Sequence, residues 1–168
     1  MNTTHPPFYP STAFPFTSIL EQHWERIRDE FEVVRSRCID YVERDLYDHG
    51  WKVFIMANFP HREVISGNDL LCPFTVDLVR RHVPRLGVLC FSVMEPGTVI
   101  EPHEGYASQY LRCHMGLDVP EGDCRLSVGD HSRAWKNGET MVFDDRHRHG
   151  AWNKTSRSRA VMLFDFIP

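Results

Sequence analysis

Apolar residues recur with a helical period in the first half of the chain. They lie three or four positions apart, as residues on one face of an α-helix do. These residues are Leu20, Trp24, Ile27, Phe31 and Val34. The spacing predicts a helix over about residues 18–36, with Ser18 and Glu21 forming a capping box at its start. A second, shorter helix is predicted from Pro73 to about His82.

From about residue 88 the pattern changes to short runs of β-branched, aromatic and aliphatic residues, separated by turn-forming segments. The strands predicted in this part are Val88–Glu95, Tyr110–Val119, Cys124–Val128, Thr140–Asp144 and Arg159–Phe166. One further strand, Trp51–Asn58, is predicted earlier in the chain. Short strands at such spacing are typical of a closed antiparallel architecture, so we expect a β-barrel or jelly roll with a helical layer packed on it. Residues 1–16, rich in proline and phenylalanine, are expected to form an extended arm laid over the domain.

Composition narrows the class of protein. The chain has 168 residues, of which 42% are hydrophobic and 25% charged, as in an ordinary globular protein. We therefore expect a single domain over residues 1–168, with a helical layer over about 1–87 and a β core over about 88–168. The formal net charge of −4 argues against a general nucleic-acid-binding surface.

We expect a cytoplasmic protein without a membrane segment, because the sequence shows no secretory or membrane-spanning pattern and its cysteines are not typical of a disulfide framework. No run approaches the roughly 20 apolar residues that a membrane helix needs, and the N-terminus lacks a secretory pattern. Five cysteines, an odd count without a CxxC pair, are better explained as reduced thiols than as disulfides or a structural zinc site.

The ten histidines are the unusual feature of the composition, because histidine is the commonest metal ligand. His103 follows a Pro-Gly turn, and His149 opens a His-x-x-x-Asn pattern ending at Asn153, which partly matches the second cupin motif. In the strand expected over 110–119, Tyr110, Arg112 and His114 share one face and apolar residues share the other. The pattern leaves open which face points into the barrel.

Over nearly its whole length the sequence resembles the aspartyl/asparaginyl β-hydroxylase family. The matching segments in the second half run from Phe91-Ser92-Val93-Met94-Glu95-Pro96-Gly97-Thr98 through Pro102-His103, Leu111–Pro120, Trp135, Gly138, Phe143-Asp144-Asp145, His149, Trp152-Asn153 and Arg159 to Phe164-Asp165. In the first half they are Phe8-Tyr9-Pro10, Phe14-Pro15, Leu20, Trp24, Ile27, Glu30 and Gly50–Phe54.

The resemblance implies a mostly β fold with N-terminal helices, a double-stranded β-helix (a cupin-like jelly roll). It also implies a dioxygenase of the hydroxylase type that uses Fe(II), 2-oxoglutarate and O2. Iron would be held by His103 and His149, and Gly105 stands where most iron oxygenases of this fold carry an acidic ligand. The positions that bind 2-oxoglutarate in the family are Ser92, Arg112, His114 and Arg159.

The chemistry of these residue types agrees with those roles. The Arg159 guanidinium can bind the far carboxylate of the 2-oxoglutarate dianion through two parallel hydrogen bonds, and the Ser92 hydroxyl can add a third. Arg112 and His114 would bind the C1 carboxylate end. Asp144 and Asp145 are interpreted as structural residues, because an aspartate can orient a neighbouring ligand histidine.

The third iron ligand is an open question at the level of sequence. Glu101 lies two residues before His103 and could share its face. His147 lies two residues before His149 and could complete a three-histidine site. A three-histidine cupin dioxygenase or isomerase that needs no 2-oxoglutarate is therefore an alternative, and a non-enzymatic metal-binding sensor module is another.

The family activity implies hydroxylation of an unactivated C–H bond with release of succinate and CO2, at the β-carbon of an Asp- or Asn-like residue. Tyr106 and Tyr110 replace residues common in the family, and with His147 they are candidate substrate contacts at the mouth of the site. The departures remove a cation near the pocket and favour a neutral or larger substrate. Because the sequence shows no helical-repeat domain or membrane anchor, we expect a small molecule, a short peptide or a carrier-bound amino acid as substrate.

Overall fold

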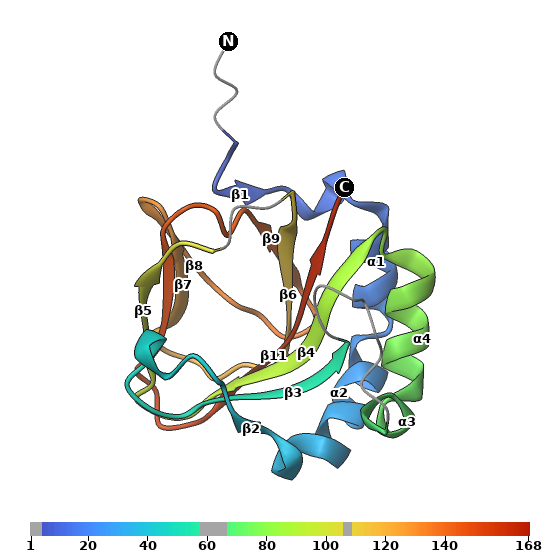
Figure 1. Ribbon diagram of the computed structural model, residues 1–168, viewed down its shortest axis with the longest axis horizontal. Helices are drawn as coiled ribbons and strands as arrows, with labels where there is room; N and C mark the ends of the chain where they lie inside the picture. Colours follow the sequence, from blue (N-terminus) through green and yellow to red (C-terminus); the bar gives the residue numbers. More distant parts are fainter. Residues whose placement is uncertain (1–4, 58–66, 106–108) are drawn as a thin grey trace.

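Two antiparallel β-sheets face each other, with a layer of helices on one side (Figure 1). The computed structural model describes residues 5–57, 67–105 and 109–168. The larger sheet consists, in spatial order, of β1 (Phe8–Tyr9), β9 (Thr140–Phe143), β6 (Leu111–Asp118), β11 (Arg159–Phe166), β4 (Leu86–Met94), β3 (Trp51–Ala57) and β2 (Ile39–Asp40). The smaller sheet consists of β5 (Val99–His103), β10 (His149–Asn153), β7 (Cys124–Val128) and β8 (His131–Ala134).

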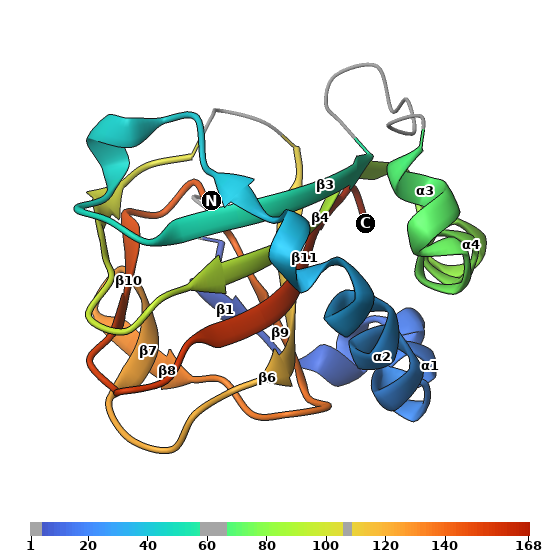
Figure 2. The same cartoon turned by 90° about the horizontal axis from the view of Figure 1, so that it is seen from below.

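The helices cover the outer face of the larger sheet, as Figure 2 shows from a second direction. They are α1 (Pro15–Gln22), α2 (Trp24–Val34), α3 (Asn68–Leu71) and α4 (Pro73–His82), with single 3-10 turns at Ser11–Ala13, Arg35–Arg37 and Arg44–Leu46. No helix in the described ranges is long and apolar enough to cross a membrane. The mostly β fold with N-terminal helices is confirmed, and the arrangement is that of a double-stranded β-helix.

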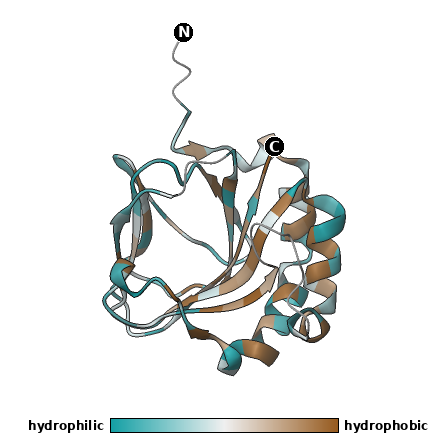
Figure 3. Ribbon diagram, in the orientation of Figure 1, coloured by the Kyte–Doolittle hydropathy of each residue, from teal (hydrophilic) through white to brown (hydrophobic). Residues whose placement is uncertain are grey.

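Side chains alternate between the two faces of the larger sheet, and both faces are largely buried. In β4, Leu89, Phe91 and Val93 pack against the helices. Cys90 and Ser92 point to the opposite face, toward the smaller sheet. Because neither face is open to water, β4 reads as a nearly continuous hydrophobic run, which is brown in Figure 3.

The alternation also settles the orientation of β6. Its apolar residues Leu111, Cys113 and Met115 pack in the core beneath the helices, which places Arg112 and His114 on the inner face. The polar face of this strand therefore lines the interior between the two sheets.

The predicted helix over 18–36 is in fact two helices, interrupted at His23, whose backbone is not helical. The predicted capping box is wrong. The first helix begins at Pro15, whose fixed φ suits a first helical turn. Ser18 donates to the Pro15 carbonyl inside the helix, and the Glu21 carboxylate accepts hydrogen bonds from the backbone and side chain of Thr140.

The predicted limits of α4, β7 and β11 are confirmed, and β4, β6 and β9 begin or end within two residues of their predictions. Residue Asn58, the predicted end of β3, lies outside the described residues. The sequence analysis missed β1, β2, β5, β8 and β10. The expected arm is extended at Phe8–Tyr9, where it pairs with β9, but it turns into helical structure from Ser11.

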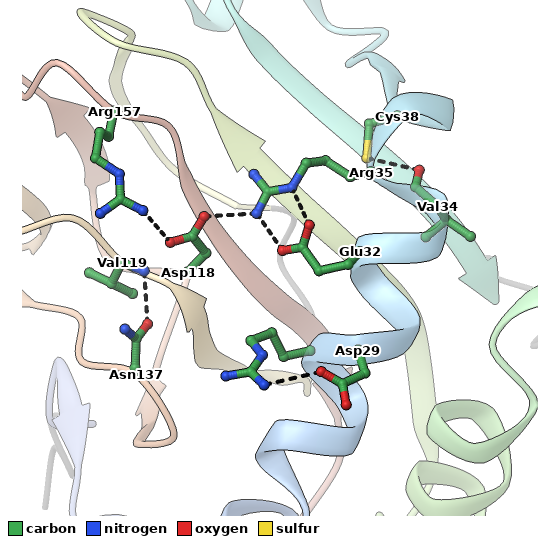
Figure 4. A network of polar contacts seen from close by, with 10 residues as sticks. Asp29, Glu32, Val34, Arg35, Cys38, Asp118, Val119, Asn137 and Arg157 are labelled. Carbon is green, nitrogen blue, oxygen red and sulfur yellow. Dashed lines mark hydrogen bonds and ion pairs between the residues drawn. The ribbon is translucent and has the colours of Figure 1, made fainter.

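The expected division near residue 87 does not separate helices from strands. Strands β1, β2 and β3 precede it, and all three belong to the larger sheet. An ion pair also links the helical layer to the sheet, as Figure 4 shows: Arg35, just after α2, contacts Asp118 of β6 and is held by Glu32 of α2. Arg157 contacts the second oxygen of Asp118.

Candidate metal and co-substrate site

His103 and His149 lie side by side on neighbouring strands of the smaller sheet. They are register partners in the β5–β10 pair, so their side chains leave the sheet on the same face. Their ring centroids are 4.3 Å apart. Two imidazoles at this separation can bind one metal ion.

Each ring is oriented by a backbone carbonyl two residues earlier. The Nδ1 atom of His103 lies 2.8 Å from the Glu101 carbonyl oxygen, and that of His149 lies 2.9 Å from the His147 carbonyl oxygen. A carbonyl only accepts, so Nδ1 carries the hydrogen and the Nε2 lone pair is left for a metal. Burial lowers the pKa of His149 to about 4, which keeps this imidazole neutral at physiological pH.

Arg159 is a buried cation on the opposite side of the interior. Its exposed fraction is 1%, and its guanidinium carbon lies 4.4 Å from the centroid of the Trp135 ring. Nη1 donates to the Ser92 carbonyl oxygen, whereas Nε has no hydrogen-bond partner among the described residues. Burial lowers the pKa of this arginine to about 10, so it stays charged at neutral pH. A buried, incompletely bonded guanidinium is a site for an anion.

His114 presents a second buried donor. Trp135 Nε1 donates to His114 Nδ1 over 3.2 Å, which places the ring hydrogen on Nε2. That Nε2 is buried without a partner in the described part of the chain. Burial, with Arg159 nearby, holds the pKa of His114 well below its usual value, so the ring is a neutral donor.

All the predicted metal and co-substrate residues line a single cavity between the two sheets. Its lining comprises Trp51, Ser92, Ile100, His103, Arg112, His114, Leu126, Trp135, Phe143, His149, Gly150, Ala151, Arg159 and Leu163. The Ser92 hydroxyl oxygen accepts a 3.1 Å hydrogen bond from Trp51 Nε1, which leaves its hydrogen for another acceptor. The cavity therefore brings two neighbouring imidazoles together with buried donors on the facing sheet.

Arg112 has protein partners at the rim of this cavity. Its Nε and Nη2 atoms bond the two carboxylate oxygens of Asp165 at 2.7 and 2.9 Å, and Nη2 lies 3.3 Å from Asp145. Sequence reasoning assigned Arg112 to a ligand carboxylate and gave Asp165 no role. A guanidinium already held in this way acts on a ligand through its remaining nitrogen and through its charge.

The geometry explains why residue 105 has no side chain. A Cβ atom at Gly105 would lie 2.7 Å from Cγ of Asp145, far inside normal contact distance. The Gly105 amide also donates to the Asp145 carbonyl oxygen over 2.8 Å. Asp145 thus fills the space that an acidic side chain at 105 would need, and it serves the structure, as the sequence analysis predicted for the aspartate pair.

Neither alternative third ligand joins the two histidines. The Glu101 side chain is exposed, and the His147 ring is bonded through Nε2 to the backbone carbonyl of His5. Among the described residues no group of three or more histidine, cysteine or acidic side chains could hold a metal ion. The three-histidine arrangement is therefore not present in this structure.

The candidate substrate residues lie away from the cavity or outside the description. The Tyr110 ring packs against Gly87, with its Cε1 atom 2.9 Å from the place of a Cβ there. Tyr106 lies outside the described residues. Sequence reasoning gave no role to Trp51 and Trp135, although each supplies an indole N–H to a side chain of the site. Buried tryptophans that need a polar partner were the available signal.

Comparison with known proteins agrees with this architecture. One solved structure with this fold is an oxidoreductase of the 2OG-Fe(II) oxygenase family from Burkholderia pseudomallei. Its TM-score is 0.57 at 13% identity, and the match covers 83% of this chain and 77% of that chain. Another is a prolyl-4-hydroxylase from Pseudomonas putida, with a TM-score of 0.54, 10% identity and coverage of 88% of each chain. Both likenesses concern the fold, a jelly roll of two facing antiparallel sheets.

The family model for aspartyl/asparaginyl beta-hydroxylase matches residues 21–168, and the chain belongs to this family. Similar relatives include an ornithine lipid ester-linked acyl 2-hydroxylase from Rhizobium tropici, 32% identical over 97% of this chain and 61% of the relative. The human aspartate beta-hydroxylase domain-containing protein 2 is 40% identical over 88% of this chain and 43% of its own length. The mouse aspartyl/asparaginyl beta-hydroxylase is 28% identical over 87% of this chain and 20% of its own length. The chain thus spans between a fifth and about three fifths of these relatives.

Proposed function

We propose that this protein is an Fe(II)- and 2-oxoglutarate-dependent oxygenase that hydroxylates an unactivated C–H bond. The observation that supports the proposal is the pair of unpartnered buried donors, Arg159 Nε and His114 Nε2, in the same cavity as two imidazoles with free Nε2 atoms. A dicarboxylate that also chelates a metal would satisfy both donors and complete the metal's ligands.

The residues present fit both groups. His103 and His149 would hold iron as neutral ligands, each fixed by its carbonyl contact. Arg159 and the Ser92 hydroxyl would bind the far carboxylate of 2-oxoglutarate, and His114 with Arg112 would bind the end nearer the metal. Iron, 2-oxoglutarate and O2 together would supply an oxidant strong enough for C–H hydroxylation, with release of succinate and CO2.

The protein contributes binding and orientation in a cavity whose co-substrate-binding residues are largely buried. Arg159 is buried among Trp135 and the strands of the larger sheet, so its charge acts at low dielectric on an anion bound there. Because the metal ligands stand on one sheet and the anion-binding groups on the other, a co-substrate that bridges them is held in one orientation.

The substrate proposed for this oxygenase is an Asp- or Asn-like residue or a related small molecule or carrier-bound amino acid. The support is the family relationship, since one relative is named for aspartyl and asparaginyl residues and another for an ester-linked acyl group. The non-enzymatic sensor has less support, because a sensor does not require buried donors arranged for a second, anionic ligand.

The test is anaerobic addition of 2-oxoglutarate to the Fe(II)-loaded protein, followed by its visible charge-transfer absorption, and then measurement of succinate after oxygen is admitted. We expect the absorption band and succinate formation in the wild type. Both should be lost in His103→Ala and His149→Ala and retained in His131→Ala, which removes an exposed histidine of β8. A wild type that binds Fe(II) but neither binds nor consumes 2-oxoglutarate would refute the proposed function.

A further inference from the structure

A second cavity lies beside the site cavity, on the inner face of the larger sheet. It has a volume of about 70 Å³, and three residues border both cavities: Trp51, Arg112 and Leu163. The rest of its wall is formed by Tyr41, Val53, Ile55, Val88 and Cys90. Apart from Arg112, the wall is aromatic, aliphatic or thiol.

Strand register connects this second cavity directly to the site. Ile55 of β3 is opposite Cys90 of β4, Cys90 is opposite Leu163 of β11, and Leu163 is opposite His114 of β6. Four adjacent strands therefore carry one row of side chains on the same face. At the usual strand spacing the row is about 14 Å long. It begins in the second cavity and ends at a predicted co-substrate residue.

The polar groups in the wall already have partners. Trp51 Nε1 donates to Ser92, and the Tyr41 hydroxyl donates to the Glu43 carboxylate over 3.1 Å. Two nitrogens of Arg112 are bonded to Asp165. No described residue of the wall has a buried side-chain nitrogen or oxygen without a partner.

Apart from the remaining nitrogen of Arg112, the wall offers a peptide segment little to bond, so most of the backbone amides buried there would lose hydrogen bonds, which costs free energy. An aliphatic chain carries no such groups, and its burial is favourable in proportion to the apolar area removed from water.

The second cavity also has an apolar approach from the surface. Ile39 of β2 is the register partner of Val53 and is 66% exposed. A surface groove that includes Ile39, Val53 and Ile55 reaches this edge of the sheet. Apolar surface thus continues from the exterior, past β3, to the wall shared with the site.

We propose that the second cavity binds an aliphatic chain of the substrate, and that the substrate is an acyl- or alkyl-bearing small molecule rather than a polypeptide side chain. The inference rests on the proposed function, because the reacting carbon has to lie near His103 and His149. The chain would pass Leu163, where the two cavities meet.

The first test uses the wild-type protein loaded with Fe(II) and 2-oxoglutarate under anaerobic conditions. Butanoyl-, octanoyl- and dodecanoylglycine are titrated while tryptophan fluorescence is followed, because Trp51 borders both cavities. We expect binding to tighten with chain length, by up to about fourfold for each fully buried methylene. Equal affinity across the series, or tighter binding of N-acetylaspartate amide than of dodecanoylglycine, would overturn the inference.

The second test fills the cavity. Ile55→Trp and Cys90→Leu should each weaken dodecanoylglycine binding by about tenfold or more and leave butanoylglycine and 2-oxoglutarate binding within about twofold. Val33→Trp is the control, since Val33 lies on α2 outside the cavity and is 66% exposed. A variant that binds 2-oxoglutarate normally and dodecanoylglycine like the wild type would contradict the inference. A wild-type protein that binds the acylglycines but does not bind 2-oxoglutarate would instead refute the proposed function.

Discussion

At the scale of single residues, the site is defined by buried donors whose hydrogen bonds the protein does not complete. Arg159 and His114 both have a nitrogen without a partner among the described residues, and both contact Trp135. Leaving such groups unsatisfied costs stability, typically about 1–3 kcal/mol each. That cost is offset when a ligand supplies the missing acceptors.

Arg159→Ala should weaken 2-oxoglutarate binding by about 100-fold, because a carboxylate in a buried site loses its charged hydrogen bonds. Arg159→Lys should recover part of the affinity, since it restores the charge without the fork. The measurement is the anaerobic charge-transfer titration. Arg125→Ala, which removes a guanidinium bonded to Ser132 elsewhere on the smaller sheet, is the control. An unchanged affinity in Arg159→Ala would show that the anion binds elsewhere.

Gly105→Ala should destabilise the fold by about 1–3 kcal/mol, because its Cβ would overlap the Asp145 carboxyl group. The free energy of unfolding in urea measures the effect. Combining Gly105→Ala with Asp145→Gly removes the side-chain part of the overlap and should recover part of the loss, while the backbone oxygen of residue 145, 2.8 Å from the place of the Cβ, remains. If Gly105→Ala alone were neutral, steric exclusion would not explain the missing acidic ligand.

At the scale of elements, side chains from distant segments fix where helices begin. The Glu30 carboxylate of α2 accepts hydrogen bonds from the backbone amides of Phe74 and Thr75 and from the Thr75 hydroxyl, at 2.6–2.9 Å. These amides are in the first turn of α4, where no intrahelical acceptor exists. An acidic group there also interacts favourably with the helix dipole.

Glu30→Ala should therefore lower the free energy of unfolding by about 2 kcal/mol. Asp29→Ala, at an exposed position past the first turn of the same helix, removes the same charge without breaking a cap, and because its ion pair with Arg28 is exposed it should change it by less than about 0.5 kcal/mol. Urea denaturation of both variants provides the comparison. Equal effects of the two substitutions would mean that the cap adds nothing to stability.

The sequence predicts the elements that carry an apolar run and misses β5 and β10, which carry the histidine pair. Strands β7 and β11 and helix α4 have clear patterns and were predicted with correct limits. Strand β5 contains Pro102, and β10 begins with His149 followed by Gly150, so neither has the composition of a typical strand. The two strands that align the histidines therefore lack the residue pattern on which strand prediction depends.

The candidate site was found by resemblance rather than by periodicity. Periodicity shows that Arg112 and His114 share a face but not that this face points inward, because the opposite face of β6 is also buried, under the helices. The ion pair between Arg112 and Asp165 could not be predicted either, since it depends on the register of β6 with β11. Register between strands far apart in sequence is a property of the assembled sheet.

At the scale of the whole molecule, the fold places the buried histidine His114 where it cannot easily be charged. Its pKa is well below the usual value in the folded protein, so below about pH 6.5 the unfolded chain binds more protons than the folded one. The free energy of unfolding should therefore fall as pH is lowered through this range.

For one such histidine the slope reaches at most about 1.4 kcal/mol per pH unit. Urea denaturation between pH 7 and 5 would measure it in the wild type and in His114→Gln, which should have a shallower slope. His131→Ala, at an exposed histidine, should leave the slope unchanged. If His114→Gln kept the full slope, the pH dependence would belong to other groups.

The histidine pair and the buried donors lie on different sheets, which has a consequence for how rigid the site is. The histidine pair moves with β5 and β10, whereas Arg159 and His114 move with β11 and β6. Movement of one sheet relative to the other changes the distance between the histidine pair and the nitrogens of Arg159 and His114. A dicarboxylate of fixed length that contacts both groups therefore reports this distance. If the proposed co-substrate bridges the two sheets, dicarboxylates one carbon shorter or longer should bind more weakly, and the size of the loss would measure how readily the sheets move relative to each other.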